Sequence, residues 1–261
     1  TGELDIKTTY VLPVTIKSVE GIGVLQSAKT YYYVFRGASL INVVCNISRN
    51  RAYPDFKNDS KFNNLTENTM EILFKANSFP NTLNTLMGIE SNYLLRIGDA
   101  TIPNNQLQVA TSVNNCTSAD LQLESGKWYH VAVAFNKGNV KVYINGVEKL
   151  SGSTGKSSVS LGAKHTNEED GSRCFWVGYS YKDDRYFDGV VSEVRIWNRA
   201  LTAEEIQATN HFYTIEPESE GLIAYWKFDE GSGTVAKDYS VSGYDLTIEK
   251  EPKWESVSLP Q

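Results

Sequence analysis

The sequence predicts an all-β protein: a sandwich of two antiparallel sheets with one short helix and a small β segment at its N-terminal end. Three observations predict it: many short runs rich in β-branched and aromatic residues, turn residues between these runs, and only one helical pattern. The chain has 261 residues, which is enough to bury a substantial core in one large β domain.

The clearest strands lie in the segment 126–150, GKWYHVAVAFNKGNVKVYINGVEKL. Apolar side chains stand at every second position from Tyr129 onward, which predicts a strand with these side chains on its buried face. His130 then lies on the opposite face of the strand. A second strand comes after the turn NKGN, and Asn145-Gly146 supplies the positive φ of a tight turn into a third. Three antiparallel strands in sequence form a meander.

Other runs of similar composition predict the remaining strands, and one segment predicts the helix. In RALTAEEIQATN, Thr202 can cap a helix in which Glu205, three residues later, returns the hydrogen bond. Further strands are expected within 68–78, 84–90, 93–99, 105–113, 174–180, 187–198, 221–231, 244–250 and 254–260.

Two strands near the N-terminal end, within 10–19 and 29–37, stand apart from the rest. A two-stranded hairpin is not stable by itself, so these strands either close a small β domain or pack on the remainder of the chain. We therefore expect two parts. Residues 1–37 form an N-terminal β segment, and residues 38–261 form the sandwich domain.

Charge and cysteine content exclude several classes of partner and site. The chain carries 25 Lys and Arg against 31 Asp and Glu, a net charge of −6 without a basic run, so we expect no nucleic-acid partner. No apolar run is long enough to span a bilayer, and we expect a soluble chain. The three cysteines allow one disulfide, for which we favour Cys116–Cys174.

Three segments, taken together, resemble one known family. GKWYHVAVAFNKGNVKVYINGVE, FDGVVSEVRIWNRALTAEEIQ and EGLIAYWKFDEGSGTVAKDYSVSGYDLTI are similar to motifs of the laminin-G-like branch of the concanavalin A-like lectin/glucanase superfamily. The resemblance covers residues 38–261 and implies a concanavalin A-like jelly-roll sandwich. The members of this superfamily include sugar binders, glycoside hydrolases and protein-adhesion modules, so the fold does not choose the function.

The first 37 residues resemble the closing strands of an immunoglobulin-like domain of unknown function. That domain precedes such lectin-like modules in surface lipoproteins of gut bacteria, and its earlier strands are absent from this sequence. The resemblance implies a bacterial protein that is secreted or displayed at the cell surface, held by an outer-membrane lipoprotein anchor outside this chain.

We expect no catalytic residues. Glucanases of this superfamily place carboxylates on one face of a strand, as in E-x-D-x-E, because strand alternation brings them together. Here Glu71 stands alone among apolar residues, and Glu193 has Arg195 as its neighbour on the same face. The resemblance implies glycan binding, which we expect to be non-catalytic, with two alternatives: a glycoside hydrolase with an unrecognised acidic pair, and a protein–protein adhesion module.

The loop GYSYKDDRYFDG, residues 178–189, is the predicted sugar site. Exposed aromatic rings stack on sugar faces, and polar groups beside them bind hydroxyls. Tyr53 and Phe56 form a second aromatic group. The predicted ligand-binding residues are Tyr179, Tyr181, Asp183, Asp184, Arg185 and Tyr186.

Calcium is the metal that the resemblance suggests, since several members of the superfamily bind it through loop aspartates. The candidate ligands are Asp229, Asp238 and Asp245, with Asp183, Asp184 and Asp188 as the alternative set. The spacing from Asp238 to Glu249 also fits an EF-hand loop, but no helices flank it.

Overall fold

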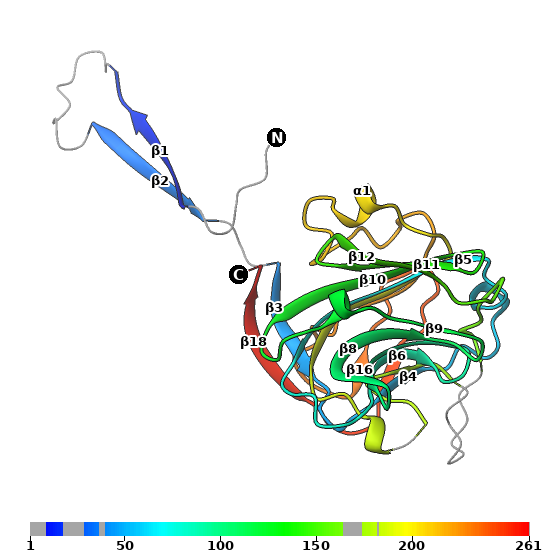
Figure 1. Ribbon diagram of the computed structural model, residues 1–261. Coiled ribbons are helices and arrows are strands. Elements are labelled where there is room, and N and C mark those ends of the chain that lie inside the picture. Colours follow the sequence, from blue (N-terminus) through cyan, green and yellow to red (C-terminus); the bar gives the residue numbers. More distant parts are fainter. Residues whose placement is uncertain (1–8, 18–28, 37–39, 164–173, 182, 261) are drawn as a thin grey trace. The chain divides into compact units, whose positions relative to one another are not determined.

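The computed structural model describes residues 9–17, 29–36, 40–163, 174–181 and 183–260. Two antiparallel sheets, each of eight strands within these residues, form the bulk of the structure (Figure 1). They confirm the two-sheet sandwich that the sequence predicts. The chain divides into two compact units, Val43–Val257 and a smaller one made of Thr1–Asn42 with Ser258–Gln261.

The first sheet contains the predicted meander, whose three strands are neighbours at one edge. The strands are arranged across the sheet in the order β12 (Val147–Ser153), β11 (Asn139–Ile144), β10 (Trp128–Asn136), β5 (Glu67–Ala76), β14 (Gly189–Trp197), β3 (Ile41–Asn46) and β18 (Lys253–Leu259). β15 (Leu222–Trp226) also pairs with β14.

The second sheet is built from shorter strands. Its order is β16 (Val235–Ala236), β17 (Leu246–Ile248), β4 (Ala52–Pro54), β13 (Trp176–Val177), β6 (Asn84–Ile89), β7 (Tyr93–Asp99), β8 (Ile102–Ala110) and β9 (Asn115–Cys116). Loops that a rigid scaffold positions are where binding residues concentrate.

The hydrophobic core lies between the two sheets, because the inward-facing side chains of both are apolar. Ile72 and Phe74 of β5 are fully buried, and they belong to the same cluster as Leu95 of β7. Tyr93 of β7 meets Phe135 of β10 with 5.7 Å between ring centroids, so aromatic rings from opposite sheets pack directly. This packing fixes the ends of the strands, from which the loops extend.

The outer face of the meander is also buried, which the strand pattern did not predict. Residues 130–135 of β10 are buried on both faces, where alternation predicted one. The reason is a second apolar cluster, in which Ala132 and Tyr143 pack against Trp197, Leu201 and Ile206. The segment after β14 therefore covers this face of the first sheet.

The helix of this covering segment is α1 (Ala203–Ile206), seen above β12 and β11 in Figure 1. The predicted capping box is confirmed: Thr202 Oγ1 accepts a hydrogen bond from the Glu205 N–H, and Glu205 Oε2 accepts one from the Thr202 N–H. None of the helices in the described part of the chain has the length and apolar character that crossing a bilayer requires.

The favoured disulfide is wrong. Cys45, Cys116 and Cys174, all within the described ranges, form no disulfide bond. Cys116 Sγ donates to the carbonyl of Ser153 at 3.2 Å, whereas Cys174 packs in a separate cluster with Trp176. The two sulfurs therefore belong to different packing environments.

The smaller unit contains a two-stranded antiparallel sheet. β1 (Thr9–Thr15) and β2 (Thr30–Arg36) pair along their whole length, from Thr9 opposite Arg36 to Thr15 opposite Thr30. Large side chains of both strands are exposed, as at Tyr32 with 67% of its surface accessible. The identity of this segment as the end of an immunoglobulin-like domain, and the domain boundary after residue 37, stay predictions.

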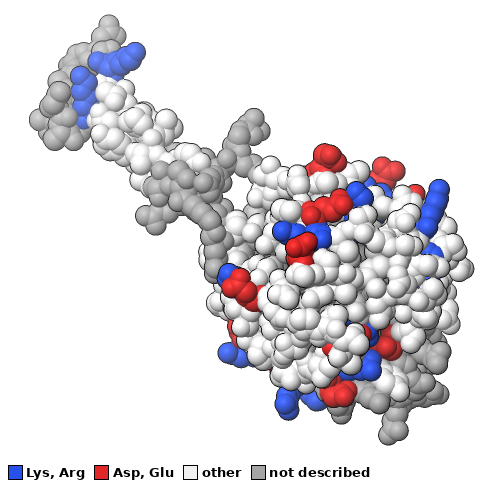
Figure 2. All heavy atoms as spheres, in the orientation of Figure 1, with Lys and Arg blue, Asp and Glu red and all other residues white. Residues whose placement is uncertain are grey.

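Charges of both signs are mixed on the visible face of the larger unit. Figure 2 shows lysine and arginine next to aspartate and glutamate on that face, without a wide region of one sign among the described residues drawn there. This pattern agrees with the net charge of −6. The absence of a nucleic-acid partner stays a prediction.

Candidate functional site: a pocket beneath the 178–189 loop

The predicted loop forms one wall of a pocket of about 680 Å³, which we call the loop pocket. Other walls come from the connections between β3 and β4 and between β5 and β6, so segments far apart in the sequence meet here. The pocket is lined by Ser48, Arg49, Pro80, Asn81, Asp184, Tyr186, Phe187, Asp188 and Lys250.

Hydrogen bonds hold these connections together. The carboxylate of Asp188 accepts hydrogen bonds from Ser48 Oγ at 2.8 Å and from Ser78 Oγ at 2.5 Å. Asn81 Nδ2 donates to the carbonyl of Tyr186 at 3.1 Å. Because these bonds join the predicted loop to the β3–β4 connection and to the β5–β6 connection, the walls of the pocket are preformed.

Two tyrosines of the predicted site have different roles in the loop. Tyr179 is only 5% exposed, and its ring centroid lies 5.2 Å from that of Trp176 and 4.8 Å from that of Tyr186. The Arg51 guanidinium lies over the same ring at 4.6 Å. Tyr179 therefore packs inside the protein, whereas Tyr186 is half buried and lines the pocket.

Tyr181 and Arg185 lie outside the lining of the loop pocket. Tyr181 is 38% exposed, and the Arg185 guanidinium lies over its ring at 5.0 Å. Arg185 Nη1 also pairs with Glu90 at 3.0 Å. The side chain of Asp183 lies outside the described part of the chain. The structure thus brings Asp184 and Tyr186 together in the pocket, and sugar contacts of all six residues stay predictions.

Three charged side chains that line the pocket have no partner among the described residues. Arg49, Asp184 and Lys250 are exposed, and none of them forms a side-chain hydrogen bond or ion pair there. Sequence reasoning missed Arg49 and Lys250, because they come from connections at opposite ends of the domain sequence. Neither has a local spacing that would have revealed it.

The second predicted aromatic group is wrong in part. Phe56 is fully buried and stacks on Phe62 with 3.9 Å between ring centroids, so it belongs to the core and offers no sugar platform. Tyr53 is half buried and meets Trp176 edge-on at 5.2 Å. The aromatic residues of the segment 51–58 therefore belong more to core packing than to a binding surface.

The aspartates proposed as calcium ligands shape a loop. Asp238 is buried, and its Oδ1 accepts hydrogen bonds from the N–H groups of Tyr225 and Ser240, while Oδ2 accepts one from Tyr244. Asp245 Oδ1 accepts the N–H of Asp238 itself. Backbone N–H donors thus occupy both carboxylate oxygens of Asp238. The binding of calcium by Asp229, Asp238 and Asp245 stays a prediction.

A second polar constellation, which we call the buried network, lies on the covered face of the first sheet. Strand register explains it: Tyr225, Arg195, Glu71 and Ala132 are direct partners across β15, β14, β5 and β10, so they share one face. Its members are Glu71, His130, Glu193, Arg195, Trp197, His211 and Tyr225.

A β-bulge adds Glu193 to this face. The register of β14 against β5 shifts between Ser192 and Arg195, and Glu193 takes a φ of +49°. The Glu193 carboxylate pairs with Arg195 and accepts the Tyr225 hydroxyl at 2.7 Å. The ion pair predicted between Glu193 and Arg195 is therefore confirmed, although the irregular backbone that supports it was not predicted.

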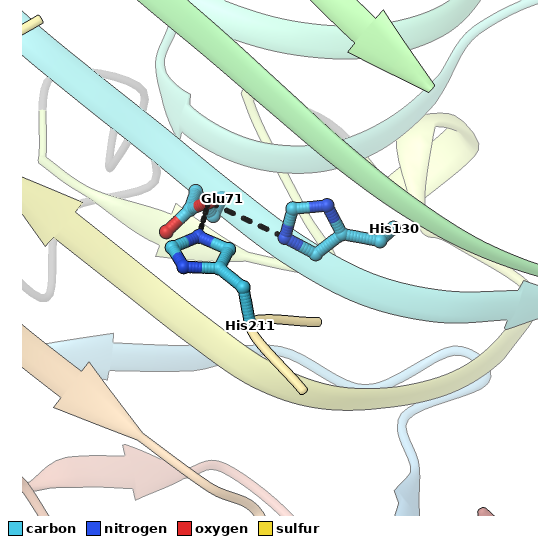
Figure 3. Close-up of side chains that lie close together, drawn as sticks. All are labelled: Glu71, His130 and His211. Atoms are coloured by element: carbon cyan, nitrogen blue, oxygen red, sulfur yellow. Dashed lines mark hydrogen bonds and ion pairs between the residues drawn. The ribbon is translucent and has the colours of Figure 1, made fainter. Parts of the chain in front are cut away.

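Glu71 is the centre of the network, and it is not isolated as the sequence suggested. Its Oε1 lies 2.7 Å from His211 Nε2 and 3.3 Å from His130 Nε2. Figure 3 draws both contacts as dashed lines. Its Oε2 accepts the indole N–H of Trp197 at 2.7 Å and lies 3.7 Å from Arg195 Nη1. The sequence could have indicated this network, because a single glutamate in an apolar strand is buried and a buried carboxylate requires hydrogen-bonding or charged partners.

The electrostatics of the network result from burial and pairing. Burial alone would raise the pKa of Glu71, but its interactions with His130 and His211 outweigh burial and hold this pKa well below its usual value. Burial lowers the pKa of His130 and raises that of Glu193, in each case against the effect of the neighbouring opposite charge. Glu71 is thus a stable buried anion.

Comparison with known proteins supports the fold. The chain resembles a solved structure from Bacteroides ovatus, a protein for which carbohydrate binding has been proposed, with 27% identity and a TM-score of 0.70. The match covers 97% of this chain and 70% of that one. No curated protein matches the chain.

Two more distant structures share less. A heptameric SAP-like pentraxin from Limulus polyphemus is 14% identical, with a TM-score of 0.46 over 67% of this chain and 84% of that one. Domain 4 of an extracellular arabinanase from Geobacillus stearothermophilus, solved with arabinotriose, is 21% identical, with a TM-score of 0.46 over 66% and 76% of the two chains. Neither likeness is close enough to support an argument about function.

A family model matches residues 50–207, a stretch that includes the meander, the loop pocket's predicted wall and α1. It describes concanavalin A-like lectins and glucanases, and it spans more than half of the chain. The chain therefore belongs to the concanavalin A-like lectin/glucanases superfamily.

Proposed function

We propose that this protein binds carbohydrate in the loop pocket, as a lectin-like module that does not cleave its ligand. The observation that carries the proposal is the pocket itself: a preformed hollow of about 680 Å³, with the Tyr186 ring and three charged side chains that have no partner among the described residues. Membership of the lectin/glucanase superfamily and the Bacteroides ovatus relative support the same class of ligand.

The chemistry of the pocket suits a sugar. A tyrosine ring can pack against the C–H face of a pyranose, while Arg49 and Lys250 can donate hydrogen bonds to its hydroxyls and Asp184 can accept them. These three groups have no described internal partner to lose, so a ligand gains their hydrogen bonds at little internal cost. The volume lies within the range of about 300–1,000 Å³ that is usual for small-molecule sites.

Three carboxylates, those of Glu71, Glu193 and Asp188, support binding without catalysis because they are already engaged within the protein. Glu71 and Glu193 are buried and paired with cationic or hydrogen-bonding partners, so a glycosidic bond has no access to them. In the pocket, Asp188 is engaged by two serine hydroxyls. Release of reducing sugar from a bound glycan would contradict this part of the proposal and support the hydrolase alternative.

The proposal extends to location and cofactor. A glycan-binding module acts on polymers outside the cell, so we propose that the protein is secreted or anchored at the bacterial cell surface. There, a protein partner is the alternative ligand.

Calcium binding by the loop aspartates is a separate proposal, tested by melting scans with calcium and with EGTA. A Tm that rises with calcium supports it, and an unchanged Tm contradicts it.

The proposed site is tested by a glycan array, and then by calorimetric titration of the best ligand. The double variant Arg49→Ala/Lys250→Ala is expected to lose at least about tenfold in affinity, because each charge-assisted hydrogen bond contributes about 1.5–3 kcal/mol at most sites. Lys149→Ala is the matched control, since Lys149 is an exposed lysine on β12 that does not line the pocket. Equal affinity of both variants would place the glycan elsewhere.

A further inference from the structure

We propose that the buried network contains a metal site, in which Glu71, His130 and His211 bind a zinc ion. The site is independent of the loop pocket, and its role is to join the covering segment to the first sheet. Glu71 and His130 come from the neighbouring strands β5 and β10, whereas His211 lies after α1 in the segment that covers them.

The three side chains converge from different elements on one point. One ligand atom from each residue, a carboxylate oxygen or a ring nitrogen, lies within 4.8 Å of the other two. Figure 3 shows both imidazole rings pointing a nitrogen at the Glu71 carboxylate. The separations from Glu71 Oε1 are 2.7 Å to His211 Nε2 and 3.3 Å to His130 Nε2. Ligand atoms about 2.0–2.2 Å from a shared zinc ion need only small movements from these positions.

His130 provides an independent reason to expect a ligand. Its side chain is completely buried, yet neither ring nitrogen makes a hydrogen bond within the described structure, although Nε2 lies 3.3 Å from Glu71 Oε1. A buried polar group without a partner costs about 1–3 kcal/mol in general. Coordination through Nε2 would give this nitrogen the partner that the protein does not supply.

The donor atoms and the groups around them suit a zinc ion. Two imidazoles and one carboxylate form a donor set that zinc uses in proteins, and the remaining position of a four-coordinate ion can take water. The other oxygen of Glu71 is held by the Trp197 indole, which orients the carboxylate as outer-shell partners of metal ligands do. Glu193 offsets the charge of Arg195 beside the site.

The experiment uses the full chain without a histidine tag, stripped of metal by a zinc chelator and then titrated with zinc sulfate. We expect one zinc per chain by elemental analysis. We also expect Tm to rise by about 5–10 °C when free zinc exceeds its Kd a hundredfold. His211→Ala should abolish both effects. His165→Ala is the matched control because His165 is the third histidine of the chain, and it should retain both.

Substitution of cobalt for zinc keeps the proposal testable if His211→Ala does not fold. Cobalt bound by two imidazoles and a carboxylate in the folded wild-type chain should give visible ligand-field absorption that zinc displaces. Absence of this absorption, together with an unchanged Tm in zinc, would overturn the proposal. Retention of zinc by a folded His211→Ala variant, or its loss from His165→Ala, would overturn it equally.

Discussion

The loop pocket and the buried network use the same kinds of side chain in opposite ways. Both combine carboxylates, cationic groups and tyrosine, but the network is buried beneath the covering segment whereas the pocket is formed by exposed connections. In the network, Arg195 contacts Glu193, Glu71 and the carbonyl of His211. In the pocket, Arg49 and Lys250 have no described partner.

This difference separates groups that hold the fold from groups that can bind. A buried charge must be compensated within the protein, so its removal leaves other charges without partners and destabilises the fold. An exposed charge without a partner contributes little to stability, and its hydrogen-bonding capacity remains available to a ligand. The nature of a residue therefore predicts its role only after its burial and partners are known.

The largest effect is expected on the free energy of unfolding, when one carboxylate charge is removed from the buried network and one from the loop pocket. In the metal-free protein, Glu71→Gln should lower the free energy of unfolding by about 3–5 kcal/mol, because it breaks a buried charge cluster. Asp184→Asn, the matched exposed change, should alter it by no more than about 0.5 kcal/mol. Urea unfolding of both variants measures the difference. Equal losses would contradict the distinction between the two regions.

A smaller effect is expected when the two tyrosines of the loop are compared. Tyr186→Ala should weaken glycan affinity about three- to tenfold, since this ring lines the pocket, and Tyr181→Ala should weaken it less because Tyr181 lies outside the lining. Calorimetric titration with one glycan ranks the two variants. A stronger loss for Tyr181→Ala would move the site toward Arg185 and the exposed side of the loop.

The sequence predicted the regular parts of this fold well, because strand alternation and turn residues are local signals. The meander through Asn145-Gly146 and the capping box of Thr202 with Glu205 are confirmed. The Glu193–Arg195 pair is also confirmed, although a β-bulge at Glu193 supports it and strand alternation did not predict that bulge. The covering of the outer face at Ala132 was missed, because a strand's pattern does not show which later segments pack against it.

The candidate sites were less predictable, because they are assembled from distant segments. Arg49 and Lys250 meet Tyr186 only after the strands pair, and no local pattern connects them. His130 and His211 converge on Glu71 through strand register and the path of the covering segment. Composition identified the 178–189 loop, but it could not distinguish the packed Tyr179 from Tyr186 in the pocket.

The most direct test of the central claim is the calorimetric affinity of the wild type, Arg49→Ala/Lys250→Ala and Lys149→Ala for the glycan that the array identifies. The account predicts binding by the wild type and Lys149→Ala, at least about tenfold weaker binding by the double variant, and the same Tm for all three within a few degrees. Binding by the double variant as tight as that of the wild type would contradict it.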